Sequence, residues 1–149
     1  DKSGLFSAVV KPAADGLMEI YLGSISEASV CGSANTAIDM GGDGTEQVLK
    51  YIYDNLDAFR LIFCNSAGTE YEDYFDRLAE TEEKFYRDFV RKYAKEPQKI
   101  SDFFIHVVCR TGWQYVFEVV SHDIPYEEAQ GFMKSIREYS FAGWKRVME

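Results

Sequence analysis

The chain has 149 residues, of which 46% are hydrophobic and 15% aromatic, and its formal net charge is −9. This length suits one well-packed domain, and the apolar content excludes an intrinsically disordered chain. The 16 basic residues are scattered among 25 acidic ones, so the chain lacks the clustered positive charge that a DNA-contacting surface requires. It also lacks a signal peptide and a run of about eighteen apolar residues, which predicts a cytoplasmic protein without a membrane partner.

Residues 1–31 are predicted to form a long helical region. Ser3 can cap its start, and Pro12 is expected to kink it because the proline ring removes a backbone donor. Residues 32–44 are rich in Gly, Ser, Asn and Asp, a composition that predicts a flexible surface loop.

Residues 45–96 are predicted to form a group of amphipathic helices. The first is expected to break near Asn55–Asp57 before a shorter helix, and a turn at Ser66–Thr69 precedes a long helix that ends before Pro97. Apolar residues recur at the helical period throughout this segment, while the other face of its long helix carries Glu, Asp, Lys and Arg.

Residues 97–149 contain two amphipathic stretches, Pro97–His122 and Pro125–Glu149, joined by only two or three residues. A connection this short forces two helices to run antiparallel. Both stretches carry large apolar side chains on more than one face, so burial on two sides is expected. One side would face the chain's own core, and the other would face a second copy in a dimeric four-helix bundle. The expected interface residues are Gly112, Tyr115, Val119, Ile136, Tyr139, Gly143 and Trp144. The alternative is that these side chains only pack within one chain.

A cavity for a small organic ligand is the expected binding site, because such sites are mostly apolar with a few orienting polar groups. Four residues of the penultimate helix share one face because they lie at i, i+3, i+4 and i+7: His106, Cys109, Arg110 and Trp113. They could combine ring stacking with recognition of a polar or anionic group. The expected ligand-binding residues are Tyr53, Phe59, Phe63, Tyr74, Phe75, Phe85, His106, Cys109, Arg110 and Trp113. The alternative stays open that the aromatics are plain core, that Arg110 pairs with an internal carboxylate, and that His106 is structural.

No catalytic, metal-binding or cofactor-binding residue is predicted. Cys31, Cys64 and Cys109 form no closely spaced pair, so neither a disulfide framework nor a zinc knuckle is indicated. Glu118 and His122 are one helical turn apart, but the chain lacks the repeated Glu-x-x-His motif of a di-iron bundle. It contains no nucleophile motif and no phosphate-binding loop. The pattern predicts an all-α bundle of five to six helices in one domain, residues 1–149, that is not an enzyme.

The opening DKSGLFSAVV resembles the segment that follows the recognition helix in tetracycline-repressor (TetR) family transcriptional regulators. Lys2, Leu5 and Phe6 match a Lys-x-x-Leu-Phe stretch that begins the family's linker helix, and Ala8–Val10 continue it. The order of helices is similar to that of the family's body, and Phe141-Ala142-Gly143-Trp144 resembles its final helix.

This resemblance implies an effector-binding and dimerisation body whose helix-turn-helix head, about 45 residues long in the family, is expected upstream of Asp1. Partners would be a second copy, a small apolar or amphipathic effector of unknown identity, and operator DNA only through the head. The effector would control operator affinity by moving residues 1–22, where Pro12 and Gly16 are candidate bends. A helical ligand carrier or enzyme unrelated to DNA is the alternative, and a purely structural dimer module is a third.

Overall fold

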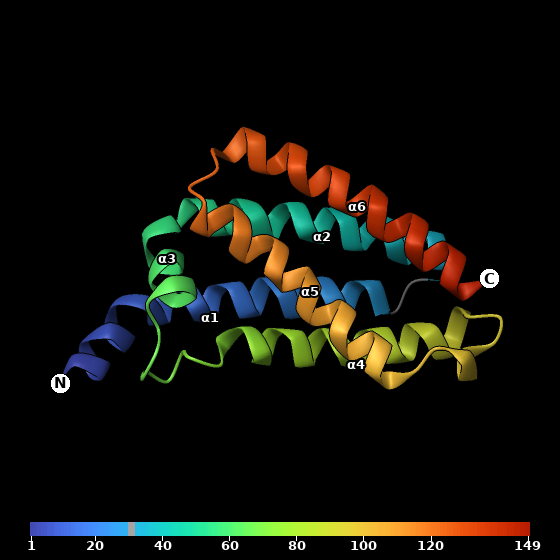
Figure 1. Cartoon of the computed structure of the whole chain (residues 1–149), viewed down its shortest axis with the longest axis horizontal. Helices are drawn as coiled ribbons and strands as arrows, with labels where there is room; N and C mark the ends of the chain where they lie inside the picture. Colours follow the sequence, from blue (N-terminus) through green and yellow to red (C-terminus); the bar gives the residue numbers. More distant parts are fainter. Residues whose placement is uncertain (30–31) are drawn as a thin grey trace.

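The computed structural model describes residues 1–29 and 32–149, with the side chains of residue 29 and of residues 34–43 outside the description (Figure 1). The described residues form six α-helices and one short 3-10 helix, without a strand. This confirms the predicted all-α fold. The helices are α1 (Lys2–Ser29), α2 (Ala34–Asp54), α3 (Leu56–Cys64), α4 (Tyr74–Tyr93), α5 (Asp102–Ser121) and α6 (Tyr126–Met148), with the 3-10 turn η1 (Pro97–Lys99) before α5.

Helix α1 runs through the middle of the bundle, with α2 on one side and α4 on the other (Figure 1). Helix α3 packs against α1 and α5, while α5 packs mainly on α4. Helix α6 lies along the outer side of α2 (Figure 1). The main core therefore draws residues from all six helices.

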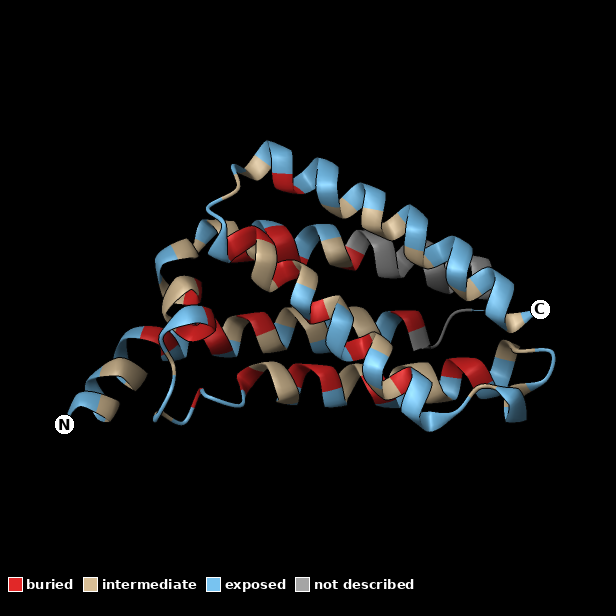
Figure 2. Ribbon diagram, in the orientation of Figure 1, coloured by how far each residue is buried: buried red, intermediate tan, exposed pale blue. Residues whose placement is uncertain are grey.

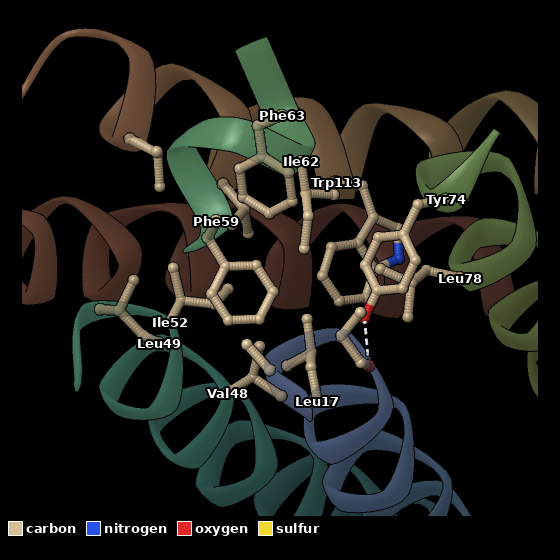
Figure 3. Close-up of a cluster of buried hydrophobic side chains, with 14 of the residues drawn as sticks. Leu17, Val48, Leu49, Ile52, Phe59, Ile62, Phe63, Tyr74, Leu78 and Trp113 are labelled. Atoms are coloured by element: carbon tan, nitrogen blue, oxygen red, sulfur yellow. Dashed lines mark hydrogen bonds between the residues drawn. The ribbon is translucent and has the colours of Figure 1, made fainter. Parts of the chain in front are cut away.

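Apolar residues at helical spacing place α1 in this core. Val10, Ala13, Ala14 and Leu17 are all buried, and they occupy positions i, i+3, i+4 and i+7 on one face. They meet Ile52 of α2 and other apolar side chains from α3, α4 and α5 (Figure 3).

Tyr74 ties α4 to α1 within this core. Its buried hydroxyl donates a hydrogen bond of 2.7 Å to the Ala14 carbonyl, drawn as the dashed line in Figure 3. A buried phenol with a satisfied hydroxyl contributes about 1 kcal/mol beyond its apolar burial. The same apolar environment raises the pKa of Tyr74, mainly because burial disfavours the phenolate.

Two glycines allow α1 and α2 to approach closely. A Cβ atom at Gly16 would lie 2.1 Å from the Tyr51 hydroxyl, and one at Gly44 would lie 1.9 Å from Ser24 Oγ. A side chain at Gly16 would overlap the Tyr51 phenol ring, and one at Gly44 would require the Ser24 hydroxyl to move. The Tyr51 hydroxyl uses this space to donate a hydrogen bond to the Ala13 carbonyl at 3.0 Å.

The expectation of a loop over residues 32–44 is wrong for most of that segment, because α2 begins at Ala34 and continues through residues 41–44. Glycines within a helix cost about 1 kcal/mol each relative to alanine. Here the helix contact offsets part of this cost, since Gly44 is buried against α1, where a larger residue would displace the Ser24 side chain. Tertiary packing has overridden local propensity.

The other predicted boundaries are close to those observed. Helix α2 ends at Asp54 and α3 begins at Leu56, at the expected break. The long helix α4 starts later than expected, at Tyr74, after a turn in which Thr69 N donates to the Ser66 carbonyl at 3.0 Å. Helix α1 is continuous across Pro12, and Figure 1 shows its first turns inclined to the remainder, in line with the predicted kink.

Helices α5 and α6 run in opposite directions, as the short connection predicts (Figure 1). The connection, residues 122–125, is slightly longer than expected. Within it Asp123 adopts a φ of 55°, a left-handed conformation that Asp tolerates better than most residues. Arg60 of α3 holds this turn through a 2.8 Å ion pair with Asp123.

Candidate functional site

The candidate site is a cleft of about 260 Å³ where α3, α4 and α5 meet. Helix α3 contributes Phe63, α4 contributes Phe75, and α5 contributes Trp113 and Phe117 to its walls. The remaining lining residues are Asp76, Ala79, Arg110 and Gln114. The cleft therefore combines an aromatic wall with three polar side chains, Asp76, Arg110 and Gln114.

The four aromatic rings of the cleft contact one another through Phe75. The Phe63 and Phe75 rings stack with centroids 4.3 Å apart and planes at 28°. Phe75 also meets Trp113 at 6.4 Å and Phe117 at 6.2 Å, with its ring inclined to both. Ring contacts at these distances are favourable in stacked and edge-to-face arrangements, so the walls form one continuous aromatic surface.

The polar group of the cleft is an ion pair between two helices. Arg110 of α5 donates from Nη2 to Asp76 Oδ1 of α4, and both side chains are about half exposed. A pair in this position is screened by water and stabilises the fold by at most about 1 kcal/mol. The expected alternative for Arg110, an internal carboxylate partner, is thus observed, and the pair nevertheless lies on the cleft wall.

Of the ten predicted ligand-binding residues, Phe63, Phe75, Arg110 and Trp113 line the cleft. The other six lie elsewhere. Phe59 and Tyr74 are buried in the main core. The Tyr53 hydroxyl of α2 donates a hydrogen bond to the Ile124 carbonyl at 2.6 Å. Phe85 stacks on Phe89 in the C-terminal half of α4.

His106 and Cys109 are also directed away from the cleft. His106 Nδ1 lies 2.5 Å from Glu83 Oε1, and Glu83 also accepts a hydrogen bond from Arg87. Cys109 is fully buried in a second small core with Val90 and Ile105. Burial and the nearby Glu82 and Glu83 carboxylates raise the pKa of the Cys109 thiol, which keeps it protonated and a poor nucleophile.

Asp76, Ala79, Gln114 and Phe117 line the cleft without having been predicted. Gln114 and Phe117 follow Arg110 at i+4 and i+7, so the helical period alone could have placed them on one face. Asp76 and Ala79 come from α4, and no sequence pattern indicates that this face of α4 meets that face of α5.

A buried carboxyl group adjoins the cleft on the side of α1. Glu82 of α4 accepts a 2.5 Å hydrogen bond from the Tyr21 hydroxyl of α1. As a residue Glu82 keeps some exposed surface, but its carboxyl end is enclosed and burial raises its pKa to about 7. The Tyr21 hydrogen bond and the nearby Trp113 indole oppose this rise by favouring the carboxylate, although Trp113 Nε1 makes no hydrogen bond of regular geometry.

Tyr21 joins this carboxyl group to the cleft wall. Its ring meets the Trp113 ring edge-on, with centroids 5.1 Å apart and planes at 82°. Burial and the Glu82 carboxylate raise the pKa of the Tyr21 hydroxyl, which therefore remains a proton donor at neutral pH. The Tyr21 side chain of α1 therefore contacts both Trp113 in the cleft wall and the Glu82 carboxyl group.

Helices α5 and α6 expose apolar side chains on the outer surface of the bundle. Phe103 is 75% exposed and Tyr139 is 72% exposed, and Val107, Phe132 and Val147 are also exposed. Ala129 is the one residue of α6 classed as buried, and Figure 2 shows the rest of that helix mostly pale blue.

The predicted interface residues differ in how far they are exposed. Tyr139 and Gly143 are exposed, whereas Gly112, Tyr115, Ile136 and Trp144 are partly covered by their own chain. Val119 is 3% exposed and belongs to the main core, so it offers no surface to a second copy in this conformation. The dimer itself stays a prediction.

In the described part of the chain, no three His, Cys, Asp or Glu side chains gather where they could hold a metal ion. Within the same residues, Cys64 and Cys109 are free thiols, while Cys31 lies outside the described residues. None of the described helices is long and apolar enough to cross a membrane. The chain matches no protein-family model, no curated protein and no solved structure.

Proposed function

We propose that this chain is the effector-binding and dimerisation body of a ligand-responsive transcriptional regulator, most similar in plan to the tetracycline-repressor family. It acts as a repressor that contacts operator DNA through a helix-turn-helix domain joined to the start of α1. The effector binds in the cleft between α3, α4 and α5. The chain has no catalytic role in this function.

The observation that carries the proposal is the contact between the cleft and α1. Trp113 lines the cleft, and its ring meets Tyr21 of α1 at 5.1 Å. A ligand that displaces the Trp113 ring therefore displaces α1, the helix to which the DNA-binding domain is joined. A coupling free energy of about 1–3 kcal/mol changes operator affinity five- to a hundredfold.

The exposed apolar surface of α5 and α6 supports the dimer. Operator recognition by a helix-turn-helix dimer needs two recognition helices about one DNA turn apart, ~34 Å. Phe103 and Tyr139 are among the most exposed large apolar side chains of the described residues, and exposed apolar patches commonly mark association surfaces. The net charge of −9 fits a body that leaves DNA contact to another domain.

A ligand carrier unrelated to DNA is the alternative function. The same cleft would serve it, but a carrier needs neither a dimer nor a mechanical contact between the cleft and α1. The oligomeric state in solution therefore separates the two.

The first experiment is light scattering across a dilution series. We expect twice the mass of the 149-residue chain, persisting at low micromolar concentration. Tyr139→Glu should give a monomer, because it places a charge on the proposed interface. Leu22→Glu is the matched control, since Leu22 is also an exposed apolar side chain but lies on α1. A wild-type chain that is monomeric at all concentrations would refute the proposal that it is the body of a dimeric transcriptional regulator.

The second experiment measures the separation of the two α1 helices in the dimer. A nitroxide label is attached to Lys2→Cys in a chain whose three native cysteines are replaced, and the distance is measured by pulsed electron resonance. We expect a mean distance of ~34 Å, the half-site spacing that the joined domains must match. A mean of roughly twice that value would exclude simultaneous contact with adjacent half-sites.

A further inference from the structure

The polar group of the cleft presents a donor and an acceptor side by side. Arg110 has five N–H groups, and the structure gives its guanidinium one bond, from Nη2 to Asp76 Oδ1. Among the described residues, neither Asp76 Oδ2 nor the other guanidinium nitrogens have a protein partner. A ligand can therefore bond to both side chains without breaking the ion pair.

Arg110 and Asp76 carry opposite charges, so this part of the cleft wall has no net charge and favours an uncharged ligand. An anion would be attracted by Arg110 and repelled by Asp76, and a cation would meet the opposite pair of forces at the same distances. A neutral edge that carries an N–H beside a C=O satisfies both side chains at once. The N–H donates to Asp76, and the C=O accepts from Arg110.

The aromatic side chains and the volume of the cleft indicate the shape of the ligand. Phe63, Phe75, Trp113 and Phe117 offer ring faces and edges that meet at centroid distances of 4.3–6.4 Å. A flat ring adds to such a surface with favourable stacking. The volume of about 260 Å³ lies just below the ~300–1,000 Å³ of sites for drug-sized ligands, which suits a ligand of one or two fused rings.

We infer that the effector is a small, uncharged planar heteroaromatic compound with a cyclic amide edge, bound with its ring against the aromatic wall of the cleft and its amide across Asp76 and Arg110. This inference rests on the proposed function, because it takes the cleft as the effector site. It adds the chemical class of the ligand and the two residues that select it.

The test compares bicyclic probes of one size by calorimetric titration. Carbostyril carries the amide edge, and N-methylcarbostyril lacks its donor. Naphthalene has no polar edge, while naphthoate and naphthylmethylamine carry a negative and a positive charge. We expect carbostyril to bind most tightly, and N-methylation to weaken it roughly tenfold or more, the loss of one hydrogen bond to a charged group.

Two variants identify the residues involved. Asp76→Ala and Arg110→Met should each weaken carbostyril binding roughly tenfold, and both should keep the fold because the pair is half exposed. Asp88→Ala is the matched control, since Asp88 is an α4 residue in an exposed pair with Arg91 outside the cleft. It should leave all affinities unchanged.

The outcomes separate this inference from the proposed function. Tight naphthoate binding that Asp76→Ala strengthens, or tight naphthylmethylamine binding that Arg110→Met strengthens, would overturn the amide-edge ligand and retain the cleft as effector site. Failure of every ring probe to bind would overturn the cleft as an effector site, and the proposed function with it.

Discussion

Replacement of Glu82 by glutamine should flatten the dependence of stability on pH. Glu82 has its carboxyl end enclosed between α1, α4 and α5, and burial raises its pKa from 4.5 to about 7. In the unfolded chain the same group returns to its ordinary pKa. Between these two values the folded chain binds the proton and the unfolded chain does not.

The sign of the effect follows from this difference in proton binding. The free energy of unfolding falls with rising pH wherever the folded state binds more protons. The stability contributed by Glu82 is therefore fully present below pH 4.5 and is lost as the pH rises through about 7. Other groups of the cluster do not titrate in this range, because the pKa values of Tyr21, Tyr86 and Cys109 are all raised.

The magnitude comes from the size of the pKa change. At about 1.4 kcal/mol per pH unit, a rise from 4.5 to about 7 corresponds to roughly 3 kcal/mol. Because Glu82 keeps some exposed surface, solvent reduces this figure, and we expect about 2 kcal/mol to be lost between pH 5 and pH 8. The glutamine side chain of the variant would remain neutral and could still accept the Tyr21 hydrogen bond.

The assay is urea unfolding of the wild type and Glu82→Gln at pH 5, 6, 7 and 8, at one protein concentration so that any dimerisation is held constant. The variant should gain about 2 kcal/mol relative to the wild type across this series. Glu80→Gln is the control, because Glu80 is an exposed carboxylate of the same helix, and its difference curve should be flat. If the free energy of unfolding depends on pH in the same way for the wild type and Glu82→Gln, the conclusion that burial raises the pKa of Glu82 is refuted.

Three further substitutions test the packing and capping of individual helices by the same urea assay. Gly16→Ala should destabilise the fold by more than about 1 kcal/mol, because its Cβ would lie 2.1 Å from the Tyr51 hydroxyl, whereas Gly23→Ala, with open space around it, should stabilise by about 0.5–1 kcal/mol. Equal effects at the two glycines would contradict the close approach of α1 and α2. Ser101→Ala should cost about 1 kcal/mol, since Ser101 Oγ caps α5 by accepting from Phe104 N at 3.0 Å, and a loss below about 0.3 kcal/mol would show that the cap is dispensable.

The helical periodicity of the sequence was sufficient to predict where most of the elements lie. Apolar residues at helical spacing predicted the helices within residues 45–96, and the break near Asn55 predicted the end of α2. Both signals are local, because they depend on residues within two turns of one another. The one large error concerned residues 34–44, where the local composition opposed a helix that contact with α1 supports.

The candidate site was predictable only in part, for a related reason. Four of the expected residues line the cleft, and they are the ones whose helix faces meet at the junction of α3, α4 and α5. Tyr53 and Phe85 have the same chemical character but lie on faces that pack elsewhere. Residue type predicts that an aromatic side chain will be covered and leaves open which neighbour covers it.

The sequence by itself determined that this chain is an all-α protein, because hydrophobic period, capping residues and helix breaks act over a few residues. It also determined that acidic residues outnumber basic ones, which gives the chain a formal net charge of −9. Only the tertiary structure decided that Asp76 meets Arg110, that Tyr21 reaches Trp113 and Glu82, and that Gly44 is buried against Ser24. These contacts join residues 20 to 92 positions apart, and the angles at which the helices cross select them, since no local pattern encodes those angles.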